Sequence, residues 1–162
     1  MAIAQRHLVI LRHAKSAWPD AIPDRQRPLA KRGRRDASAT GAWLRDELGR
    51  LDAVLCSPAE RARQTWARVA AELDNPPPAT FDKRIYDAPP GALLTVVREL
   101  PADAATALLI GHNPGLQELV ALLSRQELDM KTSSVAVLKW KGRWTDAAPE
   151  IAHLRQHVTS RG

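Results

Sequence analysis

The stretch Leu8-Val9-Ile10-Leu11-Arg12-His13-Ala14 places a histidine directly after an arginine, at the end of an apolar run. A short apolar run of this kind predicts a buried β-strand over residues 7–12. A second histidine ends another such run, in Ile110-Gly111-His112-Asn113-Pro114-Gly115. Ligands of open α/β sheets bind beyond the carboxyl ends of the strands. Two imidazoles at strand ends, with arginines nearby, therefore indicate a site that handles a phosphoryl group.

The length and composition predict one globular domain over residues 1–162. Hydrophobic residues make up 44% of the 162 residues and charged residues 26%, as is usual for such a domain. No apolar run reaches the roughly 18 residues needed to cross a bilayer, and no signal-peptide pattern opens the chain. The single cysteine, Cys56, cannot form an internal disulfide. We therefore expect a cytoplasmic protein without a membrane partner, and nothing indicates an assembly larger than a monomer.

The net charge of +6 favours an anionic partner or substrate. Nucleic acid is not expected, because the basic residues are spread along the chain without a recognition-helix or RNA-binding signature. The densest run, residues 31–35, falls early in a predicted helix and is interpreted as a solvated face. Guidance of a phosphorylated substrate is sufficient to explain the charge.

Strand-like and helix-like segments alternate along the chain, which predicts a mostly parallel sheet with helices on both faces. The expected fold is a three-layer α/β/α sandwich with added C-terminal edge strands. Strands are predicted at residues 7–12, 52–56, 79–81, 106–110, 134–140 and 150–158. Helices are predicted at residues 29–49 and 59–74, around residues 93–100 and around residues 116–123, with a loop over residues 82–91.

Three motifs in order resemble the histidine phosphatase superfamily, whose members are phosphoglycerate mutase-like. Residues 11–14 are similar to its Arg-His-Gly signature, and residues 57–65 to its Ser-Pro-x-x-Arg-Ala-x-x-Thr segment. Residues 111–115 resemble its second histidine motif. The short chain, the Arg27-Pro28-Leu29 stretch and the lack of an inserted cap domain resemble the SixA-type phosphohistidine phosphatase branch.

The resemblance implies roles for four residues. His13 would be the nucleophile that attacks phosphorus, and it must be neutral with one ring nitrogen free. Arg12 and Arg61 would hold the phosphoryl oxygens through the planar donors of their guanidinium groups. His112 would be biased toward its protonated form beside a bound dianion and would donate to it.

Several further residues are weaker candidates. Arg27, Asn113 and Ser57 are predicted to bind the substrate, although Asn113 also suits a turn or helix cap. Asp87 is either the general acid or an ordinary loop carboxylate. Ala14 stands where the superfamily has glycine, and it would be strained if that position needs a positive φ. Acidic residues and histidines are not clustered at metal-ligand spacing, so we expect no metal and no other cofactor.

The sequence thus predicts a metal-independent phosphatase that forms a phosphohistidine intermediate on His13. Its expected substrate is phosphohistidine on a protein, because an imidazole leaving group needs less acid assistance than an alkoxide. The short loops predict a shallow, open pocket. Two alternatives stay open: a phosphatase for small phosphomonoesters, and an inactive module that only binds phosphorylated partners.

Overall fold

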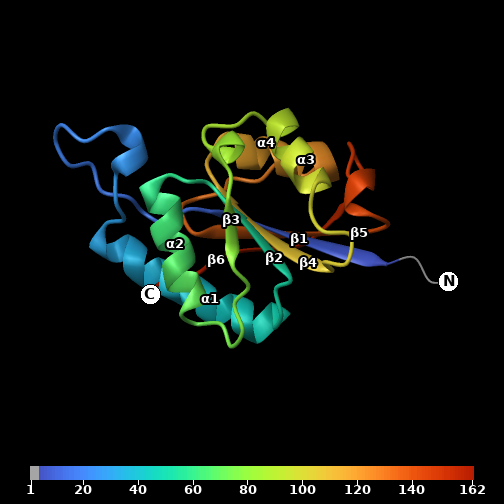
Figure 1. Cartoon of the computed structure of the whole chain (residues 1–162), viewed down its shortest axis with the longest axis horizontal. Coiled ribbons are helices and arrows are strands. Elements are labelled where there is room, and N and C mark those ends of the chain that lie inside the picture. The colour runs from blue at the N-terminus through green and yellow to red at the C-terminus, as the bar shows by residue number, and fades with distance from the viewer. Residues whose placement is uncertain (1–3) are drawn as a thin grey trace.

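The computed structural model of the chain describes residues 4–162 as a six-stranded sheet with two pairs of helices (Figure 1). The order of the strands across the sheet is β3-β2-β4-β1-β5-β6. The strands are β1 (Gln5–Arg12), β2 (Ala53–Cys56), β3 (Ala79–Phe81), β4 (Thr106–Gly111), β5 (Ser134–Lys141) and β6 (His153–Thr159). The helices are α1 (Lys31–Leu48), α2 (Glu60–Ala70), α3 (Pro90–Arg98) and α4 (Gly115–Ser124).

The sheet is parallel over four strands and antiparallel over the C-terminal two. β4 pairs in parallel with both β1 and β2, and β2 pairs in parallel with β3. β5 runs antiparallel to β1, and β6 runs antiparallel to β5. The predicted mostly parallel sheet with added C-terminal strands is confirmed.

Helices cover both faces of the sheet, which confirms the three layers. In Figure 1, α1 and α2 lie on one side of the strands, and α3 and α4 lie on the other. Along β1, Leu8 and Ile10 belong to the core beneath α3 and α4, whereas Val9 and Leu11 belong to the core beneath α1 and α2. Successive side chains of a strand point to opposite faces. The run is therefore apolar throughout because both faces of β1 are buried.

Element ends differ from the prediction by a few residues. α1 begins at Lys31 instead of residue 29, and α2 ends at Ala70 instead of residue 74. β6 spans His153–Thr159 instead of residues 150–158, because Glu150 has φ = 67° and cannot continue an extended strand. The predicted loop over residues 82–91 contains a 3-10 turn and ends at Pro90, where α3 begins. Within residues 4–162, no helix is both long enough and apolar enough to span a membrane.

The parallel strands bring distant residues to one edge of the sheet. His13, Ser57 and His112 each follow the carboxyl end of a strand, at β1, β2 and β4. β5 starts at the same edge because it runs antiparallel to β1. The long connection between β1 and α1 extends beyond this edge at the upper left of Figure 1.

Candidate active site

His13 follows β1 and is held as a neutral imidazole. Its backbone N–H donates to the Gly111 carbonyl at 3.1 Å, and only 6% of the residue is exposed. Its Nδ1 lies 2.8 Å from the Ala14 carbonyl oxygen. Because a carbonyl can only accept, Nδ1 carries the ring hydrogen and Nε2 has a free lone pair. Burial, opposed by this hydrogen bond, lowers the pKa of His13 to about 3.

His112 follows β4 and lies beside His13, with 5.2 Å between the ring centroids. Its Nε2 is 2.7 Å from the Ser57 hydroxyl oxygen. The Ser57 oxygen also accepts the Ala59 N–H at 3.2 Å, and Nε2 is the one acceptor among the described residues for the fully buried hydroxyl hydrogen, which therefore donates to Nε2. Nδ1 then carries the ring hydrogen. Burial, followed by the charge of Arg61, lowers the pKa of His112 to about 4, so the ring is neutral at pH 7.

Two arginines from different elements border the histidines. Arg12 is the last residue of β1, and its Nη1 donates to the Met130 carbonyl at 3.0 Å. Arg61 lies in the first turn of α2 and is 4% exposed. Thr65, one turn later, donates to the Arg61 carbonyl at 2.7 Å and accepts the Ala14 N–H at 3.0 Å. The hydrogen bond from Ala14 to Thr65 therefore joins α2 to the segment that follows β1, one helical turn from Arg61.

The site contains buried hydrogen-bonding atoms that have no protein partner. Among the described residues, four buried side-chain atoms lack one: Arg12 Nε, Arg61 Nε, His112 Nδ1 and Ser133 Oγ. Buried polar atoms are normally paired, and three of these four are donors on predicted site residues. Donors gathered in this way suit an oxyanion such as a phosphoryl group.

A pocket of about 260 Å³ joins the predicted residues. Every predicted site residue except Ser57 lines it, so the tertiary structure brings together residues that lie up to a hundred positions apart. Trp18 stands at its rim, 74% exposed, with the Arg27 guanidinium 3.5 Å from its ring centroid. The lining residues are Arg12, His13, Lys15, Ser16, Trp18, Arg27, Arg61, Asp87, His112, Asn113 and Thr132.

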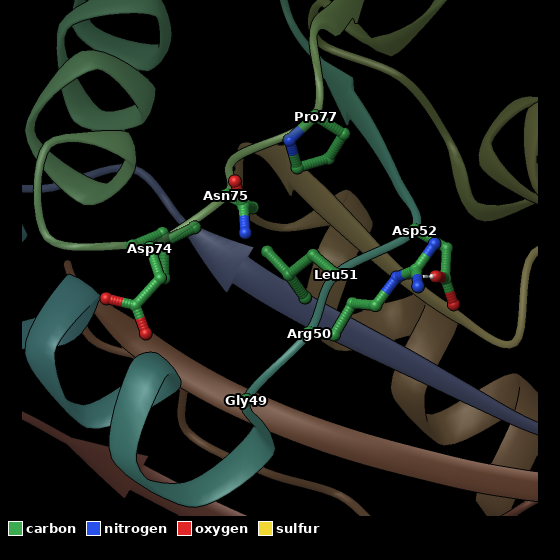
Figure 2. A pocket seen from close by; sticks show the side chains of 8 residues that line it. Gly49, Arg50, Leu51, Asp52, Asp74, Asn75 and Pro77 are labelled. Atoms are coloured by element: carbon green, nitrogen blue, oxygen red, sulfur yellow. Dashed lines mark ion pairs between the residues drawn. The ribbon is translucent and has the colours of Figure 1, made fainter.

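A larger cavity, of about 600 Å³, lies at the opposite edge of the sheet (Figure 2). It is lined by the four residues from Gly49 to Asp52, before β2, and by Leu73, Asp74, Asn75 and Pro77, before β3. Arg50 and Asp52 form an ion pair across 2.9 Å there. The cavity is remote from both histidines and is not part of this site.

Two of the predicted substrate-binding residues form their hydrogen bonds within the protein. Ser57 is fully buried, does not line the pocket and contacts His112, and its contact with substrate stays a prediction. Asn113 lines the pocket, but its amide donates to Gln117 at 2.9 Å and to the Met130 carbonyl at 2.8 Å. Both amide hydrogens are thereby used at the start of α4, which matches the alternative turn or cap role.

The structure gives the backbone conformation of both Ala14, which replaces the glycine of the superfamily, and Asp87, the possible general acid. Ala14 is fully buried and its φ is not positive, so the expected strain does not arise. Asp87 is an exposed residue of the pocket lining with φ = 48°, and its role as a general acid stays a prediction. Within residues 4–162, no cluster of three or more metal-ligating side chains occurs.

Sequence reasoning missed Asp24 and Tyr86. Asp24 opens a 3-10 turn in the β1–α1 connection, and its carboxylate contacts both Arg61 and Arg27. The Tyr86 hydroxyl donates to the same carboxylate, and the Tyr86 ring lies edge-on to His112 with 5.5 Å between centroids. The only sequence signal was the position of Asp24 three residues before Arg27.

Comparisons with known proteins found matches to both the sequence and the fold of this chain. The sequence model of the histidine phosphatase superfamily (branch 1) matches residues 8–93. The uncharacterized protein Rv1276c of Mycobacterium tuberculosis (strain H37Rv) is 40% identical over 155 residues, covering 89% of this chain and 96% of that protein. A Nakamurella multipartitia structure, provisionally assigned as phosphohistidine phosphatase SixA, has a TM-score of 0.89 at 32% identity and covers 99% of both chains. A structure of the protein histidine phosphatase SixA complexed with tungstate has a TM-score of 0.83 at 24% identity, covering 94% of this chain and 96% of that chain.

Proposed function

The chain belongs to the histidine phosphatase superfamily, branch 1, with the fold of its SixA-type members, and we propose that it removes phosphoryl groups from phosphohistidine side chains of proteins. One observation carries the proposal. The imidazole of His13 is neutral, with Nδ1–H bound to the Ala14 carbonyl, in a pocket that also holds unpaired donors of Arg12, Arg61 and His112.

In the first step, His13 Nε2 attacks phosphorus with its lone pair. The substrate P–N bond breaks, and its electron pair stays on the substrate nitrogen. A substrate ring protonated on its other nitrogen then leaves as neutral imidazole, so no further proton is needed. His13 becomes a phosphohistidine that keeps its Nδ1 hydrogen on the Ala14 carbonyl.

In the second step, water attacks the same phosphorus and the bond to Nε2 breaks. The two hydrogens of water leave with dihydrogen phosphate, and His13 returns to its neutral form with Nδ1–H unchanged. Arg12, Arg61 and His112 Nδ1–H donate to the equatorial oxygens, where charge spreads in the transition state. These steps use protein groups alone, and we propose that no metal ion takes part.

The substrate assignment rests on the pocket and on the leaving group. A small pocket at the edge of the sheet suits a side chain that protrudes from a protein. A P–N bond also agrees with a site whose two histidines are neutral and supply no strong acid. Asp87 favours the alternative, because a carboxyl group in the lining would protonate an alkoxide from a small phosphomonoester.

The test compares turnover of a phosphohistidine peptide with turnover of p-nitrophenyl phosphate. We expect the peptide to have the higher kcat/KM, and His13→Ala to lower it by at least about 1000-fold, as loss of a nucleophile does. His157→Ala, which removes an exposed histidine of β6, is the matched control and should leave turnover unchanged.

Rapid quenching should also trap an acid-labile, base-stable phosphate on His13. A preference for the ester would select the phosphomonoesterase. Phosphate binding without turnover or label would select the inactive binding module instead.

A further inference from the structure

Asp24 forms the centre of a hydrogen-bond network beside the pocket. Its carboxylate lies 3.0 Å from Arg61 Nη2 and 3.0 Å from Arg27 Nε, and it accepts from the Tyr86 hydroxyl. Its backbone carbonyl also accepts from Arg61 Nη1 at 2.8 Å. Asp24 itself does not line the pocket, whereas Arg27 and Arg61 do.

These contacts use two of the five N–H donors of the Arg61 guanidinium. Each terminal nitrogen donates one hydrogen to Asp24 and keeps a second, while Nε is buried without a partner among the described residues. Arg27 is held similarly, with Nε on Asp24 and Nη1 2.7 Å from the Ser16 hydroxyl. A guanidinium held by a carboxylate keeps its remaining N–H donors aimed before the substrate arrives.

Asp24 also places a negative charge close to an anion-binding pocket. The hydrogen bond from Tyr86, followed by those from Arg27 and Arg61, holds the pKa of this carboxyl well below its usual range. Asp24 is therefore ionised at every working pH and is no proton donor. A fixed anion beside two arginines weakens their attraction for free phosphate.

We propose that Asp24 is a positioning residue that aims Arg61 at the transferring phosphoryl group and at the same time weakens the binding of the phosphate product. This inference rests on the proposed function, because it concerns the same pocket. The Asp24 carboxylate thus has two opposite effects: it speeds phosphoryl transfer by orienting Arg61, and its negative charge loosens the binding of phosphate.

The experiment measures kcat on the phosphohistidine peptide and the Kd of inorganic phosphate by calorimetry for Asp24→Asn and Asp24→Ala. We expect kcat to fall about 10–100-fold because the donor loses its orientation. We expect the Kd of phosphate to fall about 3–10-fold because a nearby negative charge is gone. Asp20→Asn, an equal charge change on an exposed residue of the same connection, should alter neither quantity.

A double-mutant cycle tests whether Asp24 acts through Arg61. In an Arg61→Gln background, Asp24→Ala should lower kcat by less than about 2-fold, since the interaction is already absent. A full additional loss in that background would overturn the proposal. So would unchanged kcat, or weaker phosphate binding in the folded Asp24→Asn protein, which is what general damage to the site would produce. If the wild type turned over no substrate, the proposed function would fail, but the phosphate Kd would still test Asp24.

Discussion

The Ala14 carbonyl and the Ser57 hydroxyl set where the hydrogens lie on the two histidines of the site. Ala14 accepts from His13 Nδ1 at 2.8 Å, and Ser57 lies 2.7 Å from His112 Nε2. Hydrogen bonds to one ring nitrogen determine what the other nitrogen can do. His13 is thereby left with an attacking lone pair and His112 with a donor. The same chemical group thus takes two roles within one pocket.

Ser57→Ala should lower kcat by about 10-fold or more, because the partner that orients a catalytic imidazole commonly contributes 10–100-fold. KM for the phosphohistidine peptide should stay within about 2-fold, since Ser57 does not line the pocket. Steady-state kinetics check both quantities. Ser38→Ala, which removes a hydroxyl bonded to the Arg34 carbonyl on α1, is the control. A raised KM with unchanged kcat would instead support the direct substrate contact that the sequence predicted for Ser57.

The connection between β1 and α1 is held in place by close backbone contact with the helix that follows it. The Lys15 backbone carbonyl accepts the Ala30 N–H at 2.9 Å, and Ser16 forms a β-bridge with Leu29. Gly33, in the first turn of α1, lies so close that an added Cβ would overlap the Lys15 carbonyl oxygen. The basic run at residues 31–35 was interpreted from sequence as a solvated face. It contains one buried residue, Gly33, which packs against the start of the connection that includes Asp24 and Arg27.

Gly33→Ala should destabilise the protein by about 1–3 kcal/mol, as overpacking against backbone does. Gly91→Ala is the matched control, because a Cβ there, in the first turn of α3, meets nothing within 4 Å. Alanine favours helix over glycine by up to about 1 kcal/mol, so Gly91→Ala should stabilise the protein. Urea unfolding midpoints measure both changes. Equal effects of the two substitutions would contradict the close approach at Lys15.

The molecule as a whole folds around two imidazoles that must stay uncharged. His13 and His112 are each 6% exposed, and their pKa values are lowered to about 3 and about 4 from 6.5. The unfolded chain therefore binds more protons than the folded protein between about pH 6.5 and pH 4. Folding stability must fall as the pH falls through this window. The same burial that prepares His13 for attack makes the fold sensitive to mild acid.

The free energy of unfolding should decrease between pH 7 and pH 5, by at most about 1.4 kcal/mol per pH unit for each histidine. His13→Gln should remove its share of this slope. Urea titrations at pH 7, 6 and 5 provide the measurement. Asp24 does not contribute here, because the stability from its lowered pKa is lost only below about pH 4. A wild type that is equally stable at pH 7 and pH 5 would refute the neutral, buried histidines.

Local patterns in the sequence predicted the layers of the fold and most of the residues that the structure brings into one pocket. The continuous apolar runs of β1 and β4 predict strands buried on both faces, and parallel pairing then brings His13 and His112 to one edge. Arg61 was identified by its motif, four residues before Thr65 on one helix face. Element ends were less accurate, because the backbone conformation of a residue such as Glu150 depends on its packing.

Only the tertiary structure identified what supports those residues. Asp24 is hydrogen-bonded to Arg61, 37 residues away in the sequence, and to Tyr86, 62 residues away. Ser57 is hydrogen-bonded to His112, 55 residues away. Periodicity reports which side chains are buried, but not which polar atoms are paired once the elements are packed. Helix, strand and motif positions follow from neighbouring residues, whereas the hydrogen bonds that orient the arginines and fix the imidazole hydrogens arise only where distant segments meet.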